Sequence, residues 1–231
     1  SRLILILTNF FICDYFHYSL ASSLYCQTWQ PLRKRIQKTP RAKSILDRLS
    51  AENKKNEALY VKFAFHMVNK QDGIDEKQNG ELWIKGDKYK LVLPGIERYS
   101  DGSTLWTFLT EDDECQITSV GNDEDETSFS PSQMLNIYEH GFNYTYEGKK
   151  KPNGVEVDQI KLFPEKGGKP YHSIILQVKS SSNQLYRLIV KGKDGNTYTY
   201  TLSEQSPNPE VSDAFFTLNT DDIGDVIDLR E

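Results

Sequence analysis

The sequence has few of the residue patterns that build catalytic or metal sites. Its four histidines, at positions 17, 66, 140 and 172, are scattered, and no cysteine or carboxylate stands beside them at metal-ligand spacing. It also lacks a glycine-rich phosphate loop, a Gly-x-Ser-x-Gly motif and a Cys/His pairing around Cys115. No residue therefore receives a catalytic role, and we expect a protein that is not an enzyme and that uses no metal or cofactor.

Cysteine and apolar residues are both sparse. The three cysteines are Cys13, Cys26 and Cys115, so Cys115 stands alone if the first segment is removed, and no internal disulfide is then possible. The hydrophobic fraction of 37% is low for a solid core, whereas tyrosine (13) and phenylalanine (11) are plentiful. A curved sheet with much aromatic surface and one solvent-exposed face would have this composition. Its stability would come from packing and not from disulfides.

Positive charge is scarce outside the first 50 residues. That segment carries eight Lys/Arg and two acids, so the remaining 181 residues carry 20 Lys/Arg against 31 acids. This acidic body argues against nucleic acid as the ligand, because phosphate binding needs a basic face. The acidic clusters at 112–114 and 123–126 could hold a cation loosely, or they are solvated turns, since neither has the spacing of a calcium loop.

No apolar run reaches the roughly 20 residues that span a bilayer. Residues 2–13 form a shorter run after one arginine, and Ala21-Ser22-Ser23 supplies the small residues that a signal peptidase needs. We interpret residues 1–23 as a signal peptide and 24–39 as a basic, disordered head. The basic run Arg33-Lys34-Arg35 favours the alternative, a disordered head or a start site placed too far upstream, because such charge hinders translocation.

Periodicity predicts a helix followed by strands. Ala42, Ile45, Leu46 and Leu49 recur at helical spacing after Thr39-Pro40. Residues 57–69 alternate as a strand, with the larger apolar side chains on one side. Residues 79–119 then read as an antiparallel meander, with short alternating segments separated by Gly, Pro and Asp turns.

Ser130-Pro131 begins a second short helix, which ends at Gly141 and serves either as a lid or as part of the core. Further strands follow, the penultimate two joined by an Asp-Gly hairpin turn, and the last is expected at 215–218. The sequence predicts a mainly β, single-domain fold over residues 40–231. We expect one antiparallel, unclosed β-barrel of about eleven strands, capped by two or three short helices.

The order of these signals resembles the periplasmic outer-membrane lipoprotein carrier proteins, the LolA family. The resemblance covers residues 41–231. Its motifs are the first strand LYVKFAF at 59–65, GELWIK at 80–85, SDGSTLW at 100–106, the proline-initiated helix and AFFTL at 214–218. It implies an unclosed barrel in the periplasm whose apolar concave face receives the acyl chains of lipoproteins and delivers them toward the outer membrane. It also implies partners: acylated lipoproteins, an inner-membrane lipoprotein-releasing ABC transporter and an outer-membrane acceptor.

On this interpretation the apolar side of the strands binds lipid and the second helix covers it. The candidate lipid-binding residues are Leu59, Val61, Phe63, Phe65, Leu82, Ile84, Leu91 and Leu93, with Met134 and Leu135 in the covering helix.

One position departs from the family pattern. Where many members have Arg-Pro after the Leu-Trp strand, with the arginine bonded to the lid, this chain has Gly86-Asp87. That latch cannot be carried over, and Lys85 and Arg98 are either substitutes for it or ordinary surface charges. Two other functions stay open: a lipid- or peptide-sensing module that acts through an envelope protein partner, and a hydrolase with a dispersed site.

Overall fold

The computed structural model describes residues 39–120, 138 and 141–230. The chain divides into two units, residues 1–35 and 36–231. The first unit lies wholly outside the described residues, and with it the predicted signal peptide and most of the predicted basic head. All elements below belong to the second unit.

The predicted first helix is confirmed as α1 (Pro40–Asn53). Proline occupies its first position, where the missing N–H costs nothing, and the four predicted apolar residues, Ala42 to Leu49, are the buried ones. Thr39, just before the helix, bonds to strand β7 (Phe142–Lys150): its N–H donates to the Tyr144 carbonyl at 3.4 Å, and its Oγ1 accepts from the Tyr146 N–H at 3.2 Å. These two bonds hold the start of α1 against β7.

Twelve strands form one sheet in the described residues. They are β1 (Ala58–Asn69), β2 (Ile74–Lys85), β3 (Lys88–Leu93), β4 (Ile96–Ser100), β5 (Thr104–Leu109), β6 (Glu114–Ser119), β7, β8 (Val157–Pro164), β9 (Tyr171–Lys179), β10 (Leu185–Gly192), β11 (Thr197–Pro207) and β12 (Asp225–Asp228). Their order is β12-β6-β5-β4-β3-β2-β1-β11-β10-β9-β8-β7, so the sheet has two ends and is not closed. Every neighbouring pair is antiparallel except β12 with β6. The predicted mainly β, unclosed antiparallel fold is confirmed.

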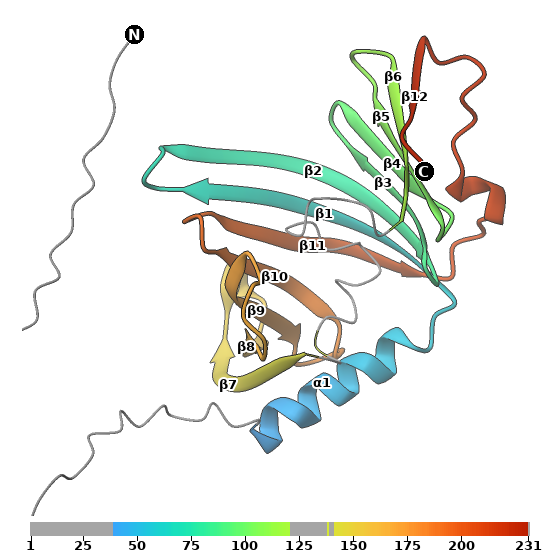
Figure 1. Ribbon diagram of the computed structural model, residues 1–231. Coiled ribbons are helices and arrows are strands. Elements are labelled where there is room, and N and C mark those ends of the chain that lie inside the picture. The colour runs from blue at the N-terminus through green and yellow to red at the C-terminus, as the bar shows by residue number, and fades with distance from the viewer. Residues whose placement is uncertain (1–38, 121–137, 139–140, 231) are drawn as a thin grey trace, which may run out of the picture. The chain divides into compact units, whose positions relative to one another are not determined.

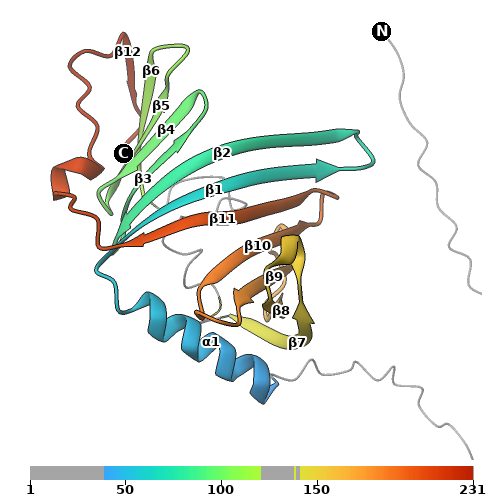
Figure 2. The ribbon, with the colours of Figure 1, turned by 180° about the vertical axis from the view of Figure 1, so that it is seen from behind.

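Three long strands form the middle of the sheet. Figure 1 shows β2, β1 and β11 side by side, with β3 to β6 beyond β2 and β7 to β10 beyond β11. The same arrangement seen from behind places α1 alongside β7 (Figure 2). Pairing of β1 with β11 joins strands from opposite ends of the described chain, with a bulge between Lys62 and Phe63. This one pairing joins the two groups of strands into a single sheet.

Tight turns of the predicted kind connect the hairpins. Gly86, between β2 and β3, and Gly195, between β10 and β11, have φ angles of 59° and 86°, a left-handed conformation that glycine adopts without strain. Pro94-Gly95 likewise separates β3 from β4, with Gly95 at φ 79°. Gly86, which stands where many LolA family members have the latch arginine, is therefore a turn residue.

Two strand predictions were wrong. Residues 215–218 are not a strand, because Asp213–Phe216 forms a short 3-10 helix, η2, in which Phe216 is fully buried. The last strand of the described chain is instead β12, which the sequence did not predict; its four residues are all exposed and pair with the edge of β6. The second predicted helix, with Met134 and Leu135, lies outside the described residues.

Candidate functional site

Eight of the ten predicted lipid-binding residues lie on three neighbouring strands and share one side of the sheet. Val61 of β1 is directly opposite Leu82 of β2, and Leu82 is directly opposite Leu91 of β3. Residues directly opposite one another, and residues two apart along a strand, point to the same face. We call this side the apolar face; it carries Leu59, Val61, Phe63 and Phe65 of β1, Leu82 and Ile84 of β2, and Leu91 and Leu93 of β3.

The apolar face continues beyond β1 onto strands that the candidate list did not include. Phe63 and Phe65 are opposite Leu202 and Tyr200 of β11, and Tyr200 is opposite Leu188 of β10. Leucine and isoleucine residues continue the row across β9 and β8, where Leu176, Ile174, Ile160 and Leu162 are fully buried. The alternation of Tyr198, Tyr200 and Leu202 with threonines in the sequence is the signal that could have identified the β11 residues.

Burial changes along this face. The part nearest α1 is closed: the four apolar residues of α1 join the same core as Leu59, Val61 and the apolar residues of β8 and β9. Phe65, Leu91 and Leu93, together with Tyr198 and Tyr200, are only partly buried against that core. The face therefore has one end filled by the protein's own side chains and another end where apolar and aromatic side chains keep part of their surface accessible.

Gly80 leaves room for two apolar side chains at the centre of the apolar face. This glycine of β2 is directly opposite Phe63. A Cβ at position 80 would lie 2.5 Å from Phe63 Cζ and 2.7 Å from Leu93 Cδ2. The Phe63 ring and the Leu93 side chain thus occupy the space above the glycine, which a side chain at position 80 would fill.

Three aromatic rings beside Phe63 form the partly accessible end. Phe65 lies 5.1 Å from Tyr200 and 6.4 Å from Tyr198 between ring centroids, and Phe63 lies 6.0 Å from Tyr200. Burial, with the nearby Tyr198 phenolate as a smaller cause, raises the pKa of Tyr200 to about 12. The Tyr198 hydroxyl donates to Asp194 in the β10–β11 turn at 3.1 Å, so its polar end reaches the edge of the apolar face.

A buried carboxylate marks the end of the face near α1. Asp158 is 5% exposed and accepts hydrogen bonds from the Tyr146 hydroxyl at 2.7 Å and from the Ser180 hydroxyl at 2.8 Å. Arg41 of α1 lies 3.8 Å away. Burial alone would raise the pKa of Asp158, but these donors and the Arg41 charge outweigh it and hold the pKa below its ordinary value. Tyr146, Ser180 and Arg41 all belong to the elements that pack here, so we assign the Asp158 carboxylate a structural role.

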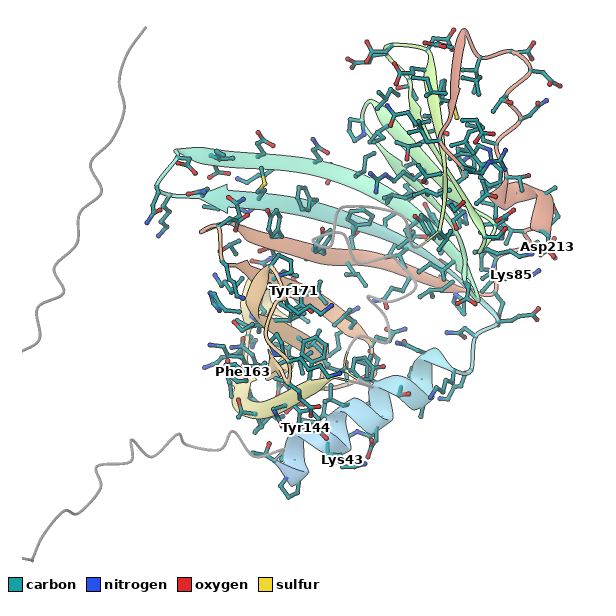
Figure 3. All side chains as sticks on the ribbon, in the orientation of Figure 1. Lys43, Lys85, Tyr144, Phe163, Tyr171 and Asp213 are labelled. Carbon is teal, nitrogen blue, oxygen red and sulfur yellow. The ribbon has the colours of Figure 1, made fainter. Side chains whose placement is uncertain are left out.

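The C-terminal segment packs on the opposite side of β2 and β3. The Phe215 ring meets Trp83 edge-on at 5.5 Å, and Lys90 Nζ lies 5.1 Å from the Phe215 centroid. Asp213 pairs with Lys85 at 3.2 Å and Lys88 at 2.9 Å, and Figure 3 shows Lys85 and Asp213 next to each other at the end of β2. Lys85 thus points away from the apolar face and pairs with η2.

No part of the described chain offers a metal or membrane-spanning element. No group of three or more His, Cys, Asp and Glu among the described residues could hold a metal ion. None of the described helices has the length and apolar character needed to cross a membrane. Cys115 of β6 is a free thiol and fully buried, and burial raises its pKa, which makes it unreactive as a nucleophile.

Comparison with known proteins gives likenesses of fold. No family model matches the chain, and no curated protein matches its sequence. Among solved structures, the chain is similar to an uncharacterised conserved protein from Thermus thermophilus, with a TM-score of 0.54 and 10% identity over 83% of this chain and 99% of that one. It also matches a LolA superfamily protein from Nitrosomonas europaea, with a TM-score of 0.43 and 13% identity over 77% and 97% of the two chains.

A third match is MucB in its complex with MucA, with a TM-score of 0.40 and 12% identity over 77% of this chain and 60% of MucB. Identities this low bear on fold alone. The strand order and the unclosed sheet described above support the predicted LolA-like fold class.

Proposed function

We propose that the protein is a periplasmic carrier that binds the acyl chains of lipoproteins on its apolar face and delivers them toward the outer membrane. The observation that carries the proposal is the single apolar face shared by the predicted residues of β1, β2 and β3, where Phe65, Leu91 and Leu93 remain only partly buried. The motif order over residues 41–231 supports it from the sequence.

The energetics explain why such a face is needed. A hydrated acyl chain of roughly 16 carbons is unfavourable by about 0.8 kcal/mol per CH₂, on the order of 12 kcal/mol in total. An acylated protein therefore does not leave a bilayer unless an apolar surface receives the chain. Complete burial of several chains would exceed the ceiling on non-covalent affinity, so we expect partial insertion, which also permits release.

The role is non-catalytic, and it calls for partners at both ends of the transfer. A releasing ABC transporter of the inner membrane would load the protein, and an acceptor at the outer membrane would unload it. Met134 and Leu135, which lie outside the described residues, are proposed to cover the bound chain. Site-specific crosslinking from positions beside the apolar face, in cells, would identify both partners.

Leu91→Glu tests the site directly. Leu91 is half-buried between Leu82 and Arg98 in the register of β2, β3 and β4, so a carboxylate there would place a charge where the acyl chain is expected to lie. We expect the variant to lose binding of a synthetic diacylated lipopeptide in equilibrium dialysis while its far-UV circular dichroism is unchanged. Asn79→Glu, an exposed change of the same charge on the opposite side of β2, should bind normally. Normal binding by Leu91→Glu would refute the proposed site.

Phe63→Glu should also abolish binding, but Phe63 is 8% exposed, so this change places a charge inside the core and should lower stability as well. Leu91→Glu is the cleaner test for that reason. Native mass spectrometry of the protein purified from cells separates the carrier from the sensing module. Bound lipoprotein or lipid supports the carrier, whereas an empty protein in a stable complex with another protein supports the sensor.

A further inference from the structure

Arg98 is a cation on the apolar face. In the register of the sheet it is directly opposite Leu91 on one side and Thr107 on the other, so it stands in the same row as Val61, Leu82 and Leu91. Its neighbour Tyr99 points the other way, because Lys90 Nζ lies 4.7 Å from the Tyr99 ring on the side covered by the C-terminal segment. The alternation of β4 therefore directs Arg98 toward the apolar side.

Arg98 is the sole Lys or Arg on this face of β1 to β6, since the lysines of β1, β2 and β3 occupy alternate positions and face the other way. Within the described residues, no hydrogen bond or ion pair holds its half-buried side chain. The acid of the same face on β6, Glu114, accepts a hydrogen bond from Gln116 at 2.8 Å. Thr107 and Gln116 continue the Arg98 row with neutral polar groups.

A guanidinium in this position suits one kind of ligand. Its planar fork binds carboxylate and phosphate through two parallel hydrogen bonds, and such charge-assisted bonds strengthen where water is partly excluded. Leu91 and Leu93, which are only partly buried, continue from it as an apolar track toward Phe63 and Phe65. A molecule that satisfies both features has a hydrocarbon chain and a negatively charged head at its end.

We propose that the apolar face takes an acyl lipid whose head carries an oxyanion, a carboxylate or a phosphate, and that the Arg98 guanidinium binds this oxyanion. The inference rests on the proposed acyl-chain binding and adds a second class of ligand to it, because the lipid-modified cysteine of a lipoprotein carries no oxyanion at its lipid head. Arg98 is then a specificity residue, which distinguishes an anionic lipid from a neutral one of the same chain length.

The test compares pairs of ligands that differ only in the charge of the head. Oleate is compared with oleyl alcohol, and 1-oleoyl lysophosphatidate with monoolein, in equilibrium dialysis against the full chain and below the critical micelle concentration. The variants are Arg98→Gln, Arg98→Lys and, as a control for net charge, Lys77→Gln, whose exposed side chain belongs to the opposite side of β2. Circular dichroism and thermal unfolding check that each variant is folded.

We expect the wild-type chain to bind each anionic lipid about tenfold more tightly than its neutral counterpart, a difference of about 1.4 kcal/mol. Arg98→Gln should remove that preference and leave neutral-lipid binding unchanged, Arg98→Lys should keep part of it, and Lys77→Gln should keep all of it. The comparison of head groups on the wild-type chain needs no variant, so equal binding refutes the proposal even if Arg98→Gln does not fold, and Arg98→Lys then tests the residue.

Three results would overturn the inference, and they differ in what they say of the proposed function. Equal binding of anionic and neutral lipids by the wild-type chain refutes the Arg98 site but supports acyl binding. Binding of inorganic phosphate alone, lost in Arg98→Gln and without binding of any lipid, shows a free-anion site instead. Absence of binding to all four lipids and to phosphate refutes the proposed acyl binding together with the inference.

Discussion

Gly80→Ala is the substitution whose effect the structure defines most closely. The new methyl group would stand 2.5 Å from Phe63 Cζ and 2.7 Å from Leu93 Cδ2, well inside the 3.5–4.0 Å at which carbon atoms pack. Leu93 is half-buried and can move, but Phe63 is 8% exposed and its ring has Tyr200 beside it at 6.0 Å. The Phe63 ring must therefore shift within a packed environment.

The magnitude follows from two opposing effects. Overpacking of a core by a methyl group costs about 1–3 kcal/mol. Replacement of glycine by alanine stabilises by about 0.4–1 kcal/mol where the backbone permits it, because it restricts the unfolded chain. Gly80 lies within a strand and has no positive φ, so this gain applies. We expect a net loss of about 1–2 kcal/mol in the free energy of unfolding, which for a protein of this size lowers Tm by about 2–8 °C.

Urea denaturation followed by circular dichroism measures the change. Gly167→Ala is the matched control, since a Cβ there meets nothing within 4 Å and the φ angle is not positive; its stability should equal or exceed that of the wild type. The double variant Gly80→Ala with Phe63→Leu should lose less than the sum of the single changes, because the shorter side chain vacates the space. A Gly80→Ala protein as stable as Gly167→Ala would show that the ring does not depend on the glycine.

Three further predictions concern other parts of the sheet. Burial raises the pKa of Tyr200 to about 12, so its contribution to stability is complete below about pH 10, the ordinary tyrosine pKa, and is lost as the pH rises toward 12. Tyr200→Phe has no phenol to ionise, so its urea midpoint should fall less between pH 8 and pH 11.5 than the wild-type midpoint does. Asp158→Ala should cost about 1–3 kcal/mol in chemical denaturation, since the Tyr146 hydroxyl loses its acceptor; Lys193→Ala, at an exposed turn position, should cost far less. Removal of residues 225–231, which carry β12, should make the buried Cys115 thiol accessible, and maleimide labelling mapped by mass spectrometry should report faster modification of Cys115 than in the full chain.

Much of the fold was predictable because its local signals are strong. The apolar spacing from Ala42 to Leu49 and the proline before it defined α1, and glycine turns separated most hairpins. The length of β2 was not predictable from pattern, because its first half, from Asp75 to Asn79, is polar on both sides and exposed. That half is a strand because β1 pairs with it along its whole length. Tertiary pairing there overrides the sequence pattern.

The C-terminal segment misled sequence reasoning for a related reason. The run Phe215-Phe216 has the composition of a strand. The two rings nevertheless lie 5.5 Å apart between centroids, whereas successive side chains of a strand point to opposite faces. β12 was missed since it is only four residues long, begins and ends with aspartate and is exposed, and it is a strand because it pairs with the edge of β6.

The candidate site was predictable in part. Two-residue periodicity placed Leu59 to Phe65 on one face, and the register of β1 with β2 then brings Leu82 and Ile84 beside them. The alternation of Tyr198, Tyr200 and Leu202 with threonines defines one face of β11, but no local signal shows that a strand more than a hundred residues later lies next to β1. The same is true of Arg98, whose neighbours follow from pairing across three strands.

The pairing of β1 with β11 also governs how the molecule is made. Phe63 emerges from the ribosome early, yet its neighbour Leu202 is translated only near the end of the chain. The apolar side of β1 therefore stays without its β11 neighbours until the end of the chain is translated. Loop closure over so long a stretch of sequence slows folding. We expect a chain that ends before Thr197 to lack β11 and leave the neighbouring edge of β1 unpaired, which favours aggregation.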